Sequence, residues 1–241
     1  NLAHLESVNL SLSEHARMRL RGKIDRVDLY EDEEHVYVKV IDYKTGAKAF
    51  QLGEMYHGLQ LQLIVYLNAV MEMEEQKHPE KEIVPAGIFY YQMKDPFVEK
   101  EVRENLGEKA VLKELKPDGI VNSSEEVITH LDRSFSGNSD VIPVGRNKDQ
   151  SLSKTSKVLS GRGFNILSEY TDQILNRIGQ RILDGEAEIL PYELGGKTGC
   201  DYCPYQGICG FDKKIPGYEY RKLSKLKDVE ALQQMEQEVK E

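Results

Sequence analysis

The sequence lacks tryptophan, holds three cysteines among 241 residues, and has no long apolar run. The cysteines, Cys200, Cys203 and Cys209, lie within ten positions of one another. A disulfide framework needs an even number of cysteines spread along the chain, so this cluster predicts a metal site in a reducing compartment, which we expect to be the cytoplasm. No stretch approaches the roughly 18 apolar residues of a membrane span, and no export signal is recognisable, so no membrane contact is predicted.

An excess of basic residues is also missing, since the formal net charge is -9. Free-standing nucleic-acid-binding domains commonly carry a basic surface, because its cations displace counterions from the phosphates. Either contact with DNA is local or assisted by another protein, or some carboxylates hold a divalent cation that meets the phosphates itself. A phosphate-binding GxxxxGK[ST] loop is absent as well, so the sequence does not predict ATP hydrolysis by this chain.

Two stretches near the N-terminus have the alternating pattern of a β-hairpin. Residues 18–30, MRLRGKIDRVDLY, predict one strand, and residues 36–46, VYVKVIDYKTG, predict a second strand closed by a glycine. One face of the second strand is apolar until it reaches Asp42 and Lys44. A buried face that ends in a carboxylate and an ammonium group indicates that the strand end opens into a site.

The rest of the chain predicts one large domain with a C-terminal extension. We expect a core at residues 1–190, with an insertion around residues 95–160, and an annex at residues 191–241 that holds the cysteines. The other predicted elements are a helix at residues 56–73, a strand at 83–93, a strand and short helix between 119 and 131, a helix at 164–184, and a terminal helix in the annex.

The hairpin supplies Asp25, Asp42 and Lys44, from the motifs GKIDRVD and VIDYKTG. Mg²⁺ prefers oxygen ligands and often needs only one or two protein carboxylates plus phosphate oxygens, so the two aspartates are a candidate pair of ligands. An amine beside the metal can orient the attacking water or stabilise charge on the phosphate, which is the role expected for Lys44. The spacing predicts metal-assisted phosphodiester hydrolysis, although surface salt bridges also produce an Asp-Xaa-Lys pattern.

The order GKIDRVD, VIDYKTG and QLQLIVYLNAV resembles the RecB-type branch of the PD-(D/E)xK nucleases, and CDYCPYQGIC is similar to the cysteine tail of its iron-sulfur members. Within that branch, residues 18–212 resemble the nuclease domains of the B subunits of bacterial AddAB helicase-nucleases. The resemblance implies an α/β, restriction-endonuclease-like fold with a mixed central sheet flanked by helices. It further implies Mg²⁺-dependent hydrolysis of single-stranded DNA, on the strand of 5′ polarity, during double-strand-break repair by homologous recombination, with an AddA-type subunit as partner.

The resemblance also assigns roles to individual residues. Asp25 and Asp42 correspond to the two metal-binding aspartates and Lys44 to the family lysine, and the main-chain carbonyl of Tyr43 is expected as a further metal ligand. A QxxxY pair on the helix after the hairpin is predicted to align DNA beside the metal, because its i, i+4 spacing brings both side chains to one helix face. The members of this pair are Gln62 and Tyr66. An alternative reading is that Tyr66 only packs in the core.

For the cysteines, the resemblance implies a 4Fe-4S cluster with a structural role, whose fourth cysteine lies upstream of this sequence. Zinc is the alternative, since thiolates hold both kinds of centre. The sequence begins at Asn1 rather than at methionine, which also leads us to expect a piece of a longer chain. Two other functions stay open: a CRISPR-associated RecB-like iron-sulfur exonuclease, and a non-catalytic module that keeps the nuclease fold for DNA docking.

Overall fold

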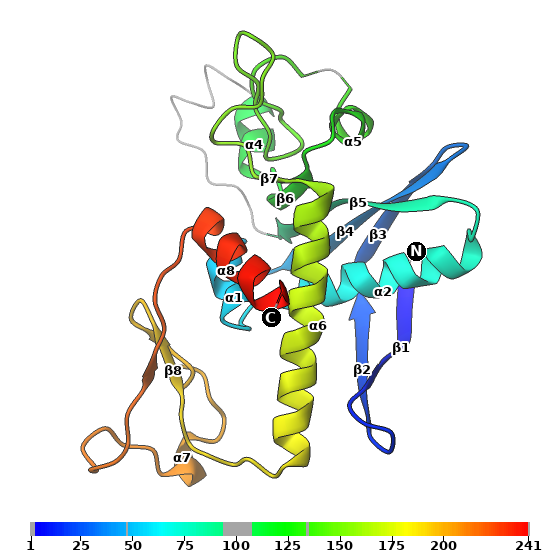
Figure 1. Cartoon of the computed structure of the whole chain (residues 1–241). Coiled ribbons are helices and arrows are strands. Elements are labelled where there is room, and N and C mark those ends of the chain that lie inside the picture. The colour runs from blue at the N-terminus through cyan, green and yellow to red at the C-terminus, as the bar shows by residue number, and fades with distance from the viewer. Residues whose placement is uncertain (1–2, 47, 94–107, 134, 241) are drawn as a thin grey trace.

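The computed structural model describes residues 3–46, 48–93, 108–133 and 135–240. A five-stranded mixed sheet forms its centre, with the strand order β3-β4-β5-β6-β7 (Figure 1). The strands are β3 (Arg26–Glu31), β4 (His35–Lys44), β5 (Glu82–Gln92), β6 (Asp118–Asn122) and β7 (Val158–Leu159). The pairs β3–β4 and β5–β6 are antiparallel, and the pairs β4–β5 and β6–β7 are parallel. The predicted α/β class with a mixed sheet is confirmed.

The single strand predicted for residues 18–30 is wrong, because the chain bends at Asp25. Before the bend, β2 (Arg17–Ile24) pairs with β1 (Ala3–Ser11) in a separate two-stranded sheet. After it, β3 pairs with β4 in the central sheet. The apolar positions change phase at the bend, from Leu20 and Ile24 before it to Val27 and Leu29 after it, and the prediction of one continuous strand overlooked this change.

The helix predicted for residues 56–73 is divided into α1 (Leu52–Tyr56) and α2 (Gln62–Lys77). Gly58 lies between them with φ = 77°, in the left-handed region that glycine tolerates best. This turn ends α1, and it makes Gln62 the first residue of α2. Gln62, the first member of the QxxxY pair, therefore lies at the N-terminal end of α2, next to the end of β4.

Both faces of β4 are buried, and each has its own cluster of apolar side chains. The larger cluster joins alternate residues of β4, such as Val38, to four helices: α1, α2, α6 (Gly161–Leu183) and α8 (Asp228–Lys240). On the other face, Ile41 and Phe89 pack against α5 (Glu125–Leu131) and the segment that follows it. The remaining helix of the insertion is α4 (Glu108–Glu114), and residues 95–107 of the predicted insertion lie outside the described residues.

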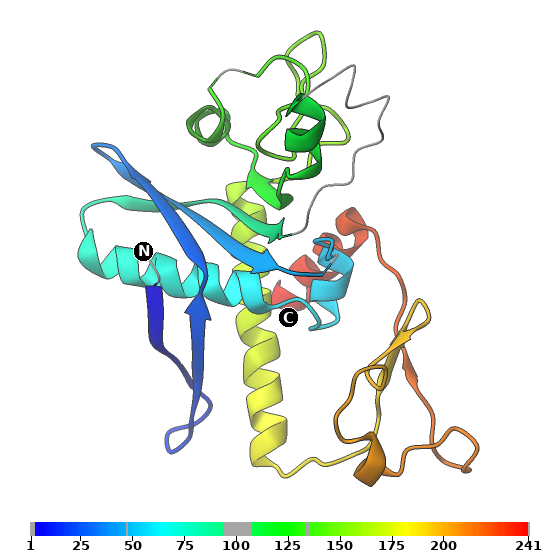
Figure 2. The same cartoon turned by 180° about the vertical axis from the view of Figure 1, so that it is seen from behind.

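The annex extends from the core on the side of α6 away from β1 and β2 (Figures 1 and 2). It contains a small sheet in the order β10-β8-β9 and the one-turn helix α7 (Gln206–Cys209). The strands are β8 (Tyr192–Leu194), β9 (Lys197–Thr198) and β10 (Arg221–Lys222). From there the chain returns to the core through α8, whose Ala231 and Met235 are fully buried. The domain boundary at residue 190 stays a prediction.

Candidate active site

The candidate site lies at the C-terminal end of β4, beside the bend that carries Asp25. The main-chain N–H of Tyr43 donates a hydrogen bond of 2.9 Å to Oδ2 of Asp25. This bond fixes the Asp25 carboxylate at the end of β4, beside the residue that follows Asp42. Asp42 itself has 3% of its surface exposed. The structure therefore brings the two predicted carboxylates to one end of the sheet.

Asp42 and Lys44 form a close ion pair. Nζ of Lys44 lies 2.5 Å from Oδ2 of Asp42, but the angles do not make a hydrogen bond, and Oδ2 has no hydrogen-bond donor among the described residues. The ammonium group offsets part of the cost of burying this charge, but the lone pairs of Oδ2 have no well-aligned donor among the described residues. Such an oxygen can coordinate a hard cation. The residues present therefore fit Mg²⁺, with Asp25, at the bend between β2 and β3, as the second candidate ligand.

Lys44 is held by the QxxxY pair of α2. It donates a 3.0 Å hydrogen bond to Oε1 of Gln62, and Nε2 of Gln62 donates a 2.9 Å hydrogen bond to the Tyr66 hydroxyl. An ammonium group can only donate, so the amide of Gln62 must direct its oxygen to Lys44 and its nitrogen to Tyr66. The pair predicted to align DNA is thus joined to the lysine, and the two readings of Tyr66 are compatible, because the ring of this residue is buried in the core.

The glycine of the GKID motif allows this arrangement. A Cβ atom at Gly22 would lie 3.1 Å from Cε1 and 3.2 Å from the hydroxyl oxygen of Tyr66. Such contacts are tighter than ordinary van der Waals distances, so β2 passes over the Tyr66 ring only because residue 22 has no side chain. Gly22 therefore helps to set the position of the Tyr66 hydroxyl.

Two residues of the site were not predicted from the sequence, Tyr90 and Lys48. Tyr90 is the neighbour of Asp42 in the parallel β4–β5 register, it is fully buried, and its hydroxyl has no partner among the described residues. Burial and then the charge of Asp42 raise its pKa. The ammonium groups of Lys44 and Lys48 lie 5.6 Å and 5.3 Å from the centre of its ring, within the range of cation–π attraction.

Lys48 lies close enough to Lys44 for the two charges to repel each other. Burial, followed by this repulsion, lowers the pKa of Lys48. The sequence signal for both unpredicted residues was weak, because a tyrosine in an apolar strand resembles a core residue and Lys48 resembles a solvated loop lysine. Only the parallel pairing of β4 and β5 could have pointed to Tyr90.

Asp28, the last residue of the GKIDRVD motif, is engaged elsewhere. Its carboxylate accepts hydrogen bonds from Arg26 (2.7 Å and 3.0 Å) and forms a 2.8 Å ion pair with Lys39. Burial opposes its ionisation, but the hydrogen bonds from Arg26 and Lys39 outweigh this effect and lower its pKa. Asp28 therefore serves to fix β3 against β4 and leaves the cation site to the other two aspartates.

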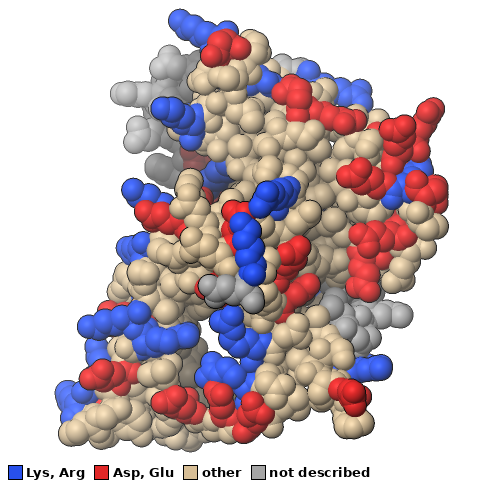
Figure 3. Space-filling view, viewed as in Figure 1, with Lys and Arg blue, Asp and Glu red and all other residues tan. Residues whose placement is uncertain are grey.

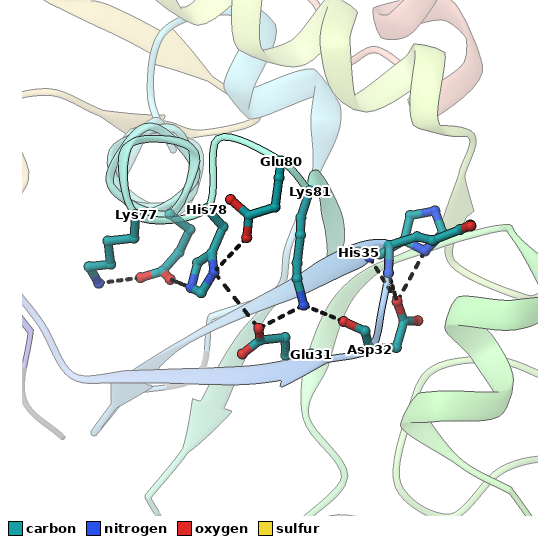
Figure 4. A network of polar contacts seen from close by, with 9 residues as sticks. Glu31, Asp32, His35, Lys77, His78, Glu80 and Lys81 are labelled. Carbon is teal, nitrogen blue, oxygen red and sulfur yellow. Dashed lines mark hydrogen bonds and ion pairs between the residues drawn. The ribbon is translucent and has the colours of Figure 1, made fainter.

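A second group of metal-ligand side chains lies at the opposite end of β4. Ligand atoms of Asp32, His35 and Glu126 lie within 4.8 Å of one another. These carboxylates already have donors: Asp32 accepts the main-chain N–H of His35 at 2.7 Å, and Glu126 accepts the Tyr37 hydroxyl at 2.7 Å. Figure 4 shows Asp32 and His35 within a network of ion pairs that ties the β3–β4 turn to the chain after α2. Its role is structural.

The three cysteines lie on one loop and turn of the annex, as free and partly exposed thiols. The N–H of Cys203 donates to the carbonyl of Cys200, and the N–H of Cys209 donates to the carbonyl of Tyr205. In the part of the chain that the structure describes, the three sulfur atoms do not form a group within 4.8 Å. Tetrahedral zinc, with Zn–S bonds of about 2.3 Å, would bring such sulfurs to roughly 3.8 Å.

The surface charge is unevenly distributed. In Figure 3, acidic side chains gather at the right, over the β3–β4 turn and the start of β5, while Lys and Arg side chains gather over the annex at the lower left. The acidic end is the one remote from Asp42, because β4 runs from His35 to Lys44. The acidic side chains seen in this view thus lie away from the candidate site, so the net negative charge of the chain does not imply a negative surface around Asp42.

Comparison with known proteins agrees with this geometry. Residues 2–210 match the model of the PD-(D/E)XK nuclease superfamily. A protein of Lachnoclostridium phytofermentans, named as the B subunit of an ATP-dependent helicase/deoxyribonuclease, is 42% identical over 218 residues, which are 87% of this chain and 19% of that protein.

Proteins with the same name from Alkaliphilus metalliredigens and Bacillus cereus are 41% and 35% identical over 95% and 98% of this chain, and 20% of each protein is covered. The chain thus spans about one fifth of the length of these relatives. Among the described residues, none of the helices has the length and apolar character that crossing a membrane requires.

Proposed function

Because this chain belongs to the PD-(D/E)XK nuclease superfamily, we propose that it is the nuclease domain of a helicase-nuclease and hydrolyses phosphodiester bonds of single-stranded DNA with Mg²⁺. The observation that carries the proposal is the buried carboxylate of Asp42, which has an oxygen without a hydrogen-bond donor and the Lys44 ammonium 2.5 Å away. The relatives are named as subunits of an ATP-dependent helicase/deoxyribonuclease, which supports the same assignment.

Each residue of the site has a defined task in this proposal. Asp25 and Asp42 supply carboxylate oxygens to the cation, together with the carbonyl of Tyr43. When bound, Mg²⁺ supplies Lewis-acid stabilisation of charge on the phosphate. Lys44 donates hydrogen bonds to the attacking water or to a phosphate oxygen, and Gln62 keeps its ammonium group directed at that position.

The wider setting follows from the family. The nuclease domain receives single strands from a motor that lies outside this chain, in a complex with an AddA-type partner, and it cuts the strand of 5′ polarity. The process is double-strand-break repair by homologous recombination in the cytoplasm. Each relative is named as one lettered subunit of a larger enzyme, which supports the existence of a partner chain.

For the annex we propose a 4Fe-4S cluster held by Cys200, Cys203, Cys209 and a fourth cysteine upstream of this chain. The sequence spacing of the three cysteines, CxxC followed by one cysteine six positions on, supports it, because it resembles the iron-sulfur members of the family. The test is the iron and acid-labile sulfide content of the full-length protein purified without oxygen. About four irons and four sulfides per chain are expected for one 4Fe-4S cluster. Zinc in their place would overturn the cluster and leave the hairpin chemistry standing.

The decisive experiment replaces Asp42 in the full-length protein, assembled with its partner. The Asp42→Ala variant should lose cleavage of the 5′-polarity strand while it keeps DNA binding and unwinding. Asp32→Asn is the matched control, because this aspartate lies on the same hairpin at the opposite end and should leave cleavage unchanged. Cleavage by Asp42→Ala at the wild-type rate would refute the assignment. A wild-type complex that unwinds DNA but never cleaves this strand would instead indicate a DNA-docking module.

A further inference from the structure

A cavity of about 550 Å³ opens directly beside the candidate catalytic lysine. Its lining comes from the end of β4, the loop before α1, the α1–α2 turn and, unexpectedly, the annex. The charged members of the lining are Lys44, Lys48, Lys197 and Glu54. Three lysines against one glutamate leave a formal charge of +2, in a chain whose overall charge is -9. The cavity is therefore locally suited to an anion.

The cavity continues along the annex. A second cavity, of about 300 Å³, shares Gln51, Glu54 and Lys197 with the first. It adds Lys225, whose side chain lies over Gly195 in the β8–β9 turn. The two together form a groove that starts at Lys44 and ends between α1 and the β8–β9 turn. Throughout this groove, basic side chains of the annex face the core.

Of the four lysines that line the groove, Lys44 is paired with Asp42, and the other three have no ion pair among the described residues. Among the described residues, no ion pair within 4 Å involves Lys48, Lys197 or Lys225, while the one acidic member, Glu54, already accepts a 2.5 Å hydrogen bond from Gln60. Cations without ion pairs on one concave surface are the features of a site whose partner is an external anion.

The annex is held in this position by contacts of its own. The N–H of Leu52 in α1 donates a 3.1 Å hydrogen bond to Asp228, and Nε2 of His57 lies 2.8 Å from the carbonyl of Ser224. Gly53 permits the approach, since a Cβ atom there would lie 2.6 Å from the carbonyl oxygen of Leu226. The chain that enters α8 is thus packed on α1. This packing holds the annex against the core, where Lys197 lines the groove.

We propose that this groove binds the sugar-phosphate backbone of the DNA strand next to the phosphate that is cleaved, with Lys48 and Lys197 as positioning residues. The inference rests on the proposed nuclease function and deepens it, because it gives the annex a part in holding the substrate. Lys48 contacts the phosphate closest to Lys44, and Lys197 contacts one farther along the strand. A phosphate beside Lys48 also relieves the repulsion between its ammonium group and that of Lys44.

The test uses Lys197→Ala and Lys48→Ala in the full-length protein within its complex. Lys214→Ala is the matched control, since Lys214 is an exposed lysine of the annex outside the groove. Loss of one single-strand phosphate contact should lower the slope of log affinity against log salt concentration by about 0.7, and loss of both by about 1.4. The KM for single-stranded DNA should rise about two- to fivefold per lysine, in line with exposed ion pairs, while kcat changes by less than twofold.

Two further measurements keep the outcome clear. Lys197→Arg retains the charge and should restore the wild-type salt slope, which a purely structural role of the lysine would not require. Binding of a short single-stranded oligonucleotide, measured by fluorescence anisotropy with Ca²⁺ in place of Mg²⁺, gives the slope without cleavage. If the wild-type protein binds the oligonucleotide with a steeper salt slope than the lysine variants but does not cleave DNA with Mg²⁺, the nuclease proposal fails and the proposal that the groove binds DNA is retained. If Lys197→Ala and Lys214→Ala have the same slope and KM, the groove is refuted.

Discussion

The hydrogen-bonded series from Lys44 through Gln62 to Tyr66 allows a quantitative prediction. In wild type, Gln62 accepts a hydrogen bond from the Lys44 ammonium and donates one to the Tyr66 hydroxyl. Gln62→Ala removes both bonds and leaves Lys44 with Asp42 as its only close partner among the described residues. The ammonium group then neutralises the carboxylate that the cation needs, instead of facing the water or phosphate.

The magnitude follows from the kind of bond that is lost. A hydrogen bond to a charged group contributes about 1.5–3 kcal/mol, and the exposed position of Gln62 favours the lower end. A loss of about 1.4 kcal/mol in transition-state stabilisation lowers kcat about tenfold. Tyr66→Phe removes only the neutral bond of about 1 kcal/mol, so kcat should fall about fivefold. Because the phenol acts through Gln62, the double variant should be no slower than Gln62→Ala alone.

The assay is steady-state cleavage of single-stranded DNA by the full complex, with the four members of this mutant cycle. The coupling free energy should be about 1 kcal/mol, and KM should stay within twofold of wild type. Gln76→Ala, an exposed glutamine near the other end of α2, is the matched control and should leave kcat unchanged. Additive effects of Gln62→Ala and Tyr66→Phe would refute the relay, and a rise in KM alone would show that the pair contacts DNA directly.

Three further predictions concern stability and pH. Met235→Ala should lower the free energy of unfolding by about 2–4 kcal/mol in urea denaturation, because Met235 is fully buried, while exposed Val229→Ala on the same helix should change it by less than about 0.5 kcal/mol. Burial raises the pKa of Asp172 despite a hydrogen bond from Asn68, so the carboxyl group holds its proton more tightly in the folded state than in the unfolded chain. The free energy of unfolding should therefore fall as the pH rises through the pKa of Asp172 in the folded state. Asp172→Asn should remove this pH dependence and be neutral or stabilising at pH 7. The pKa of Lys48 is lowered, so DNA affinity should fall as pH rises toward 10.5, and Lys48→Arg, which stays charged, should abolish that fall.

Sequence patterns brought the candidate residues of the hairpin together because these residues lie in local motifs. Asp42 and Lys44 end an apolar face of β4, and Gln62 and Tyr66 follow at helical spacing, so their place in one candidate site could be expected without knowledge of the fold. What the motifs could not show was how Asp25 reaches them. The bend at this residue accompanies the switch of pairing from β1 to β4. Its trace in the sequence is a shift of the apolar positions by one residue, from Ile24 to Val27 and Leu29, which shows that the strand is interrupted but not which strand each part pairs with.

Residues brought in by tertiary packing were beyond such reasoning. Tyr90 enters the site only because β5 pairs with β4 in parallel, with Tyr90 beside Asp42. Lys197 enters only because the annex folds back onto α1, about 150 residues after the end of β4 in the sequence. Charge patterning missed the basic groove for the same reason: its lysines are dispersed along the chain and are gathered on one surface by the fold.

The attachment of the annex also explains how a distant cysteine loop can matter for hydrolysis without taking part in it. The loop, the β8–β9 turn and the entry to α8 form one continuous segment, and it joins the core at α1 through the hydrogen bond from Leu52 to Asp228. Any group that stiffens the cysteine loop restricts the chain that carries Lys197. Its loss would therefore weaken the hold on the DNA backbone and raise KM, while Asp25, Asp42 and Lys44, fixed by the sheet and α2, would keep their geometry.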